Sequence, residues 1–149
     1  MMKIRFQEED FNAEKELSLF SKKNFKSGSI MVFLGKVKPS SDGKTIESID
    51  IEYYKKMAFT QTKKIITKLK KKCFFDDYLL LHRFGNLFPG ENIVLLLVAS
   101  KHRKDSYFFI ETVVDWLKIK ITFWKKENFK NKSHWVEQTQ EDMKKIKNS

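Results

Sequence analysis

The sequence predicts an α+β fold with a mostly antiparallel or mixed sheet, and three observations favour it. The longest apolar run, "IVLLLVA" at 93–99, is typical of a buried strand. Ile49, Ile51 and Tyr53 alternate with polar residues, as in a strand with one buried face. Residues 55–72 have helical periodicity instead, with lysines on one face. Their apolar face carries Ala58, Thr62, Ile65, Ile66 and Leu69.

The first third of the chain predicts two further strands and a helix. A short strand is expected over 3–6, a helix over 12–22 and a buried strand over 28–38. Pro39 and the following "SSDG" interrupt the last of these strands. We therefore expect a hairpin or loop that pairs the strand at 28–38 with the strand that carries Ile49.

The rest of the chain predicts a hairpin, a helix and two late strands. "DYLLLHRFG" and "NIVLLLVASK" read as strands joined by the turn-rich "GNLFPGE". Three- and four-residue steps from Tyr107 to Leu117 predict a helix that ends near Lys118 or Lys120. "ITFWKKE" and "SHWVE" resemble strands, and residues 138–149 form a polar tail or a final helix.

Length and composition indicate one domain over residues 1–149, with no linker or internal repeat. No apolar run approaches the roughly 20 residues of a membrane helix, and the acidic N-terminal stretch has no export signal. We therefore expect a cytoplasmic protein without a membrane partner. The single cysteine, Cys73, excludes an internal disulfide, and its place before two phenylalanines favours a packing role.

The net charge of +11 points to anionic partners, but the basic residues are strongly biased toward lysine. Only three of the 30 basic residues are arginine, and Arg83 and Arg103 each follow a histidine. Most lysines are expected on the solvated surface. The His-Arg pairs in "HRFG" and "HRKD" are therefore more informative than any single lysine.

The sequence lacks several common motifs of metal, phosphate and catalytic sites. His82 and His102 lack the spacing of metal ligands, so no metal site is expected. The five glycines are scattered and form no phosphate-binding loop. No GxSxG motif supports a serine nucleophile.

The stretch "DWLKIKITFWKKE" at 115–127 leaves three interpretations open. It could be a solvated basic ridge, a surface for single-stranded nucleic acid, or a cationic pocket that binds anions and stabilises oxyanions. Crowded ammonium groups lower one another's pKa, which suits a lysine to proton transfer. If the preceding helix packs antiparallel to the following strand, "HRKD" and "WKKE" would come close together.

Six blocks in a fixed order together resemble one known family. They are "VFLGKVK", "YYKKMA", "HRFGNLFPGE", "VASKHR", "DWLKIKITFWKKE" and "HWVE", which span residues 28–137. This combination is similar to the large, catalytic subunits of molybdopterin synthase. The resemblance implies an α/β hammerhead-type fold with a mostly antiparallel sheet, flanking helices and a small subdomain.

The resemblance also implies partners and a reaction. Two large subunits form a homodimer, and each binds a small ubiquitin-like sulfur carrier with a Gly-Gly C-terminus, which gives a heterotetramer. Sulfur passes from the carrier's thiocarboxylate to cyclic pyranopterin monophosphate and forms the dithiolene of molybdopterin. The resemblance implies no metal or organic cofactor and no nucleic-acid partner.

The site residues are carried over by position. Lys118 and Lys125 match the family's catalytic lysines. The positions that match its substrate-binding residues are Lys36, Val37, Lys38, His102, Arg103, Lys126 and Glu127. The carrier supplies the sulfur, so Cys73 has no relay role in this scheme.

Two positions depart from the family's pattern. Lys38 replaces the usual arginine, and lysine offers a point charge without the bidentate fork of a guanidinium. Thr122 stands where a proline usually precedes "FW". An inactive or slow homologue therefore stays open beside the enzyme and the nucleic-acid-binding module.

Overall fold

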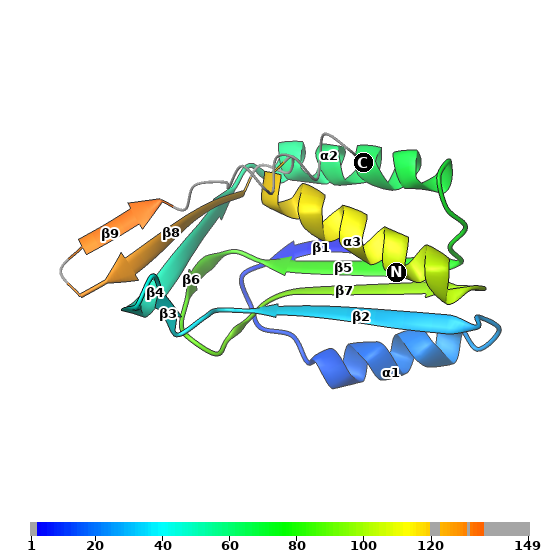
Figure 1. Ribbon diagram of the computed structural model, residues 1–149, viewed down its shortest axis with the longest axis horizontal. Coiled ribbons are helices and arrows are strands. Elements are labelled where there is room, and N and C mark those ends of the chain that lie inside the picture. The colour runs from blue at the N-terminus through cyan, green and yellow to red at the C-terminus, as the bar shows by residue number, and fades with distance from the viewer. Residues whose placement is uncertain (1–2, 120–122, 131, 136–149) are drawn as a thin grey trace.

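The computed structural model describes residues 3–119, 123–130 and 132–135, and Figure 1 shows how their elements are arranged. The helices are α1 (Ala13–Lys23), α2 (Lys55–Lys70) and α3 (Arg103–Ile119). The strands are β1 (Ile4–Gln7), β2 (Ser29–Lys36), β3 (Ser40–Ser41), β4 (Lys44–Tyr53), β5 (Asp77–Arg83), β6 (Gly85–Leu87), β7 (Asn92–Ser100), β8 (Phe123–Phe129) and β9 (Lys132–Trp135). The predicted α+β class is confirmed, and the tail at 138–149 lies outside the described residues.

The first sheet has four strands in the order β1-β5-β7-β2, and only the β1-β5 pair is parallel. Helix α1 covers one face, while α2 and α3 cover the other (Figure 1). A central strand buried on both faces needs apolar side chains in both directions. This explains why β5 and β7 contain continuous runs of leucine and valine rather than an alternating pattern.

The second sheet has five strands, with β4 at its centre. Strands β3 and β6 pair with β4, and β8 lies between β4 and β9. A two-residue turn joins β3 to β4, and both of its residues, Asp42 and Gly43, have positive φ. Asp-Gly suits such a turn because both residues tolerate the left-handed region. This sheet corresponds to the small subdomain that the sequence resemblance implied.

The expected pairing between the strand at 28–38 and the strand that carries Ile49 is wrong. Strand β2 pairs with β7 in the first sheet, whereas β4 belongs to the second sheet. The chain leaves the first sheet at Val37, whose backbone N–H donates to the Glu91 carbonyl at 2.9 Å. The hairpin at "SSDG" therefore joins β4 to the short β3, and not to β2.

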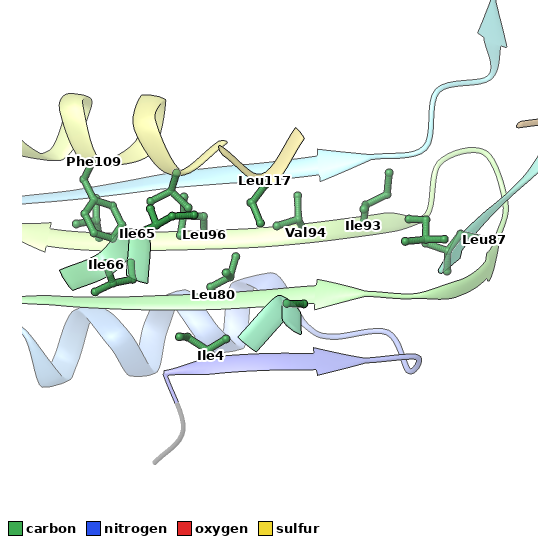
Figure 2. Close-up of a cluster of buried hydrophobic side chains, with 14 of the residues drawn as sticks. Ile4, Ile65, Ile66, Leu80, Leu87, Ile93, Val94, Leu96, Phe109 and Leu117 are labelled. Atoms are coloured by element: carbon green, nitrogen blue, oxygen red, sulfur yellow. The ribbon is translucent and has the colours of Figure 1, made fainter. Parts of the chain in front are cut away.

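The main core lies between the first sheet and the helix pair. Figure 2 shows Phe109 and Leu117 pointing from α3 toward β7, with Ile65 of α2 beside Leu96. Phe109 and Leu96 are fully buried, and each such side chain contributes roughly 1.5–3 kcal/mol of stability. Because Leu117 is buried in this core, the last turn of α3 is held near the junction of the two sheets.

Candidate active site

Lys125 lies on β8, on the face of the second sheet that is turned toward the first sheet. It stands opposite Ile51 of β4, and Glu127 stands opposite Ile49. Alternate residues of a strand share a face, so Lys125, Glu127, Ile51 and Tyr53 all point to the same side. Tyr53 packs on Phe6 of β1 with 5.4 Å between ring centroids. This contact shows that the Lys125 face meets the end of the first sheet.

Lys118 comes from the last turn of α3, directly after the buried Leu117. A lysine is favoured there because the C-terminal end of a helix carries partial negative charge. Lys118 is exposed, and its charge is one of those that act on Lys125. The two lysines predicted to be catalytic therefore lie in one electrostatic cluster.

Lys36, Val37 and Lys38 connect the first sheet to the second. Val37 is only 3% exposed, and its backbone pairs with Glu91 and Gly90 at 2.9 Å each. Its side chain therefore belongs to the core, and its role is to hold the exposed Lys36 and Lys38 in place. Lys38 acts on the charge of Lys125, so it joins the same cluster.

The electrostatic setting of Lys125 is unusual for a surface lysine. Its side chain keeps an exposed part, yet desolvation by the surrounding protein is the main cause that lowers its pKa. Glu127 opposes this effect, whereas Lys38 and Lys118 lower the pKa further. Glu127 is itself buried, at 6% exposed. The cluster formed by Lys38, Lys118, Lys125 and Glu127 is thus an anion-attracting site whose central lysine gives up its proton more readily than usual.

His102 and Arg103 do not join this cluster within one chain. They lie at the start of α3, and Arg103 and Lys118 are separated by about 22 Å along the helix at 1.5 Å per residue. The condition under which "HRKD" and "WKKE" would come close is not met within the chain, because β8 pairs with β4 and leads away from the start of α3 (Figure 1).

A chain of serine hydroxyls holds the start of α3 in place. Ser100 donates to the His102 carbonyl at 2.6 Å, and its hydroxyl also lies 2.6 Å from that of Ser106. Ser29 of β2 donates to Ser106 at 3.1 Å. His102 and Arg103 remain exposed on this fixed corner, so they are available to a molecule that docks there.

Lys126 points to the opposite face of β8 from Lys125. It stands opposite Asp50, whose carboxylate accepts hydrogen bonds from Asn128 at 2.8 Å and Asn86 at 2.7 Å. These two amides are the main causes that lower the pKa of Asp50, and Lys126 adds to them. The structure therefore places Lys126 in a polar network on the outer face, apart from the cationic cluster.

In the "HRFG" motif, Arg83 has a structural role, whereas His82 has no role assigned by the sequence resemblance. Arg83 is buried and donates from Nε to the Glu8 carbonyl and from Nη1 to the Asn92 carbonyl, both at 3.0 Å. It thereby ties the segment after β1 to the start of β7. His82 is also buried, and Lys125 is among the charges that act on it. The motif was visible in the sequence, but its relation to Lys125 was not.

Three further observations limit the chemistry. Burial is the main cause that raises the pKa of the Cys73 thiol, and Asp105 adds to it, so this cysteine is a packing residue as expected. Within residues 3–119, 123–130 and 132–135, no three His, Cys, Asp or Glu side chains gather as a metal site. No helix in this described part is long and apolar enough to cross a membrane.

Comparisons with known proteins identify the family of this chain. The family model "MoaE protein" matches residues 6–120. A molybdopterin synthase catalytic subunit from Pyrococcus abyssi is 33% identical over 129 residues, which cover 87% of this chain and 86% of the relative.

Two solved structures show the same fold. The molybdopterin synthase from Staphylococcus aureus has a TM-score of 0.82 at 27% identity, covering 93% of this chain and 99% of that one. A complex of subunits 1 and 2 of the molybdopterin-converting factor from Helicobacter pylori has a TM-score of 0.75 at 19% identity and covers 91% of each chain, which supports the fold alone. By sequence and fold, this chain belongs to the MoaE family of molybdopterin synthase catalytic subunits, which are sulfurtransferases.

Proposed function

We propose that this chain transfers sulfur from the C-terminal thiocarboxylate of a small ubiquitin-like carrier to cyclic pyranopterin monophosphate, forming the dithiolene of molybdopterin. The observation that carries the proposal is the cluster around Lys125, where Lys38 and Lys118 surround a lysine with a lowered pKa. Membership of the MoaE family supports the same reaction. A cytoplasmic location stays a prediction from the sequence.

The cluster fits the charges of the two reactants. A phosphate and a thiocarboxylate repel each other, and bringing them together costs free energy that nearby ammonium groups offset. Lys38 is suited to hold the phosphate, while Lys118 is placed to stabilise an oxyanion that develops at the attacked carbon. Lys125, with its lowered pKa, is the better proton donor for the intermediate or the carrier tail.

The partner in this proposal is a small carrier subunit. The Helicobacter pylori relative of the same fold was solved as a complex of subunits 1 and 2. A Gly-Gly tail has no side chains and suits a narrow approach to the lysine cluster. Mixing the purified chain with a thiocarboxylated carrier and the pyranopterin should yield molybdopterin. Both subunits have to be folded in this test, and a stable complex without product would refute the proposed reaction.

We further propose that His102 and Arg103 act on the cluster of a second copy in a homodimer. The roughly 22 Å along α3 prevents the pair from reaching its own Lys118, although both regions are exposed and cationic. A two-fold arrangement would bring each start of α3 to the partner's cluster. Lys126 contacts the substrate only if the substrate reaches the outer face of β8.

Mixed dimers test this arrangement directly. Arg103→Ala and Lys118→Ala chains, each inactive alone, should regain part of the wild-type activity when they are unfolded together and refolded as a mixture. In a mixed dimer, one of the two sites keeps both an intact Arg103 and an intact Lys118. If each chain carried a self-contained site, mixing would restore nothing, and that result would contradict the shared site.

A further inference from the structure

The unassigned residue with the clearest relation to the cluster is His82, at the C-terminal end of β5. Its neighbour Leu81 packs on the α1 side of the first sheet, so the His82 side chain points to the other side. There it stands in a row across the sheet, between Phe6 of β1 and Val94 of β7. A histidine in an apolar row has to be explained by the partners of its two ring nitrogens.

The packing of the two sheets places this row beside the face of the second sheet that carries Lys125. Phe6, the neighbour of His82, contacts Tyr53 of β4 at 5.4 Å between ring centroids. Tyr53 shares its face of the second sheet with Lys125, which stands opposite Ile51. Ile51 also pairs with Gly85, three residues after His82. Strand β5 and its continuation therefore bring His82 to the side of β4 and β8 that carries Lys125.

The tautomer of His82 follows from its hydrogen bond and its burial. Nδ1 lies 2.8 Å from the Arg83 carbonyl oxygen, which can only accept. Burial lowers the pKa of His82 to about 4, and the charge of Lys125 lowers it as well, so the ring is neutral near pH 7. A neutral imidazole carries one proton, and here Nδ1 must carry it. Nε2 is consequently the nitrogen that accepts a hydrogen bond.

We propose that His82 is a positioning residue for Lys125. The Nε2 atom of His82 accepts a hydrogen bond from the Lys125 ammonium and holds this group in the cluster. This role rests on the proposed function for its consequence in catalysis, but not for the contact itself. The buried ring fixes one partner of Lys125 on a rigid strand, whereas the lysine side chain alone has four flexible torsions. The other titratable groups that face the pair are Glu127, Lys38, Lys118 and Tyr53.

The first test measures the titration of Lys125 in protein labelled with ¹³C at the lysine ε-carbon. Lys125→Arg identifies the resonance by its loss. In His82→Phe the ammonium loses an acceptor that favours its charged form, so we expect Lys125 to titrate at a lower pH than in wild type. His82→Gln keeps an acceptor near the position of Nε2 and should restore much of the wild-type titration.

A matched control separates positioning from packing. Val94→Ala loosens the same apolar row, lowers stability, and leaves the acceptor on His82. It should leave the titration of Lys125 at the wild-type value. An unchanged titration in a folded His82→Phe protein, or an equal shift in Val94→Ala, would overturn the proposal.

The wild-type protein offers a readout that needs no substitution. Only three histidines occur in the chain, so the imidazole nitrogens can be assigned in ¹⁵N spectra. An unprotonated Nε2 on His82 is expected, and a proton on Nε2 would refute the proposal. In turnover assays, His82→Phe should lower kcat by about 10- to 100-fold with little change in KM. Absence of activity in wild type would refute the proposed function, while the titration and the tautomer would still test this contact.

Discussion

The two ends of α3 both carry exposed cations, but in opposite electrostatic settings. Lys118 lies in the last turn, where the helix dipole favours a positive charge. Arg103 begins the helix, where the free N–H groups favour an anion and disfavour a cation. The charge of Lys118 acts on Lys125 of the second sheet, whereas Arg103 lies about 22 Å away along α3 and does not reach this cluster. The difference indicates that the cations at the start of α3 serve a ligand or a partner rather than the stability of the helix.

The largest expected effect is on turnover at the Lys118 end. Lys118→Ala and Lys125→Ala should each lower the rate of molybdopterin formation by about 100- to 1000-fold, because each removes a charge from the place where an oxyanion forms. Both side chains are partly or fully exposed, so the fold should persist. Single-turnover assays and circular dichroism check the two points, with Lys64→Ala on α2 as the control. Full activity in Lys118→Ala would show that the C-terminal end of α3 is not part of the active site.

The next effect is a pH dependence of stability that comes from His82 of β5, on which the charge of Lys125 acts. His82 has a folded pKa of about 4, below its usual 6.5, so the unfolded chain binds more protons between these values. The free energy of unfolding should therefore fall as pH drops from about 6.5 toward 4, by a few kcal/mol. Urea titrations at several pH values measure this slope. His82→Phe should flatten it, and an identical slope in the variant would contradict the buried neutral histidine.

A smaller effect compares the two ends directly through stability. Lys118→Ala should lower the free energy of unfolding by about 0.3–1 kcal/mol. Arg103→Ala should leave the free energy of unfolding unchanged or raise it by up to about 1 kcal/mol. The reason is the sign of the helix dipole at each end. Denaturant unfolding in low salt measures both values, and added salt should reduce the difference. Equal destabilisation by both substitutions would show that Arg103 has a structural partner.

The smallest expected effect on activity is at Cys73, near the Arg103 end. Asp105 of the first turn of α3 helps to raise the pKa of the buried Cys73 thiol, which disfavours the reactive thiolate. Cys73→Ala should keep full turnover and cost about 1 kcal/mol of stability through a small cavity. Assays with a thiocarboxylated carrier check the activity. A large loss of turnover would reopen a role for Cys73 as a sulfur relay.

Much of the fold was predictable because local periodicity reflects which faces are buried. The helical steps at Ile65 and Leu69 and the apolar run in β7 identified α2 and a central strand, and both are buried as expected. The partner of β2 was not predictable. A loop of a few residues permits a hairpin, but it also permits a strand to leave for another sheet. The long-range pairing of β2 with β7, which the hydrogen bond from Val37 N–H to the Glu91 carbonyl continues, decides between them.

The candidate site was predictable in its residue types but not in its layout. Lys118 and Lys125 were identified through the family resemblance, and the structure brings them together with Lys38. The separation of Arg103 from Lys118 follows from the rigid length of α3, which a sequence block does not reveal. Likewise, Lys125 and Lys126 are neighbours in the sequence but point to opposite faces of β8.

The sequence by itself determined the helices, the buried strands, the lysine-rich composition and the family. Short-range spacing and residue chemistry are sufficient for these properties, because burial of one face or stripe leaves a period in the chain. The tertiary structure alone decided that strand β2 joins β7, that the charge of Lys125 acts on the buried His82, and that His102 and Arg103 lie far from the lysine cluster. These relations depend on contacts between residues distant in the chain, which the order of residues does not encode locally.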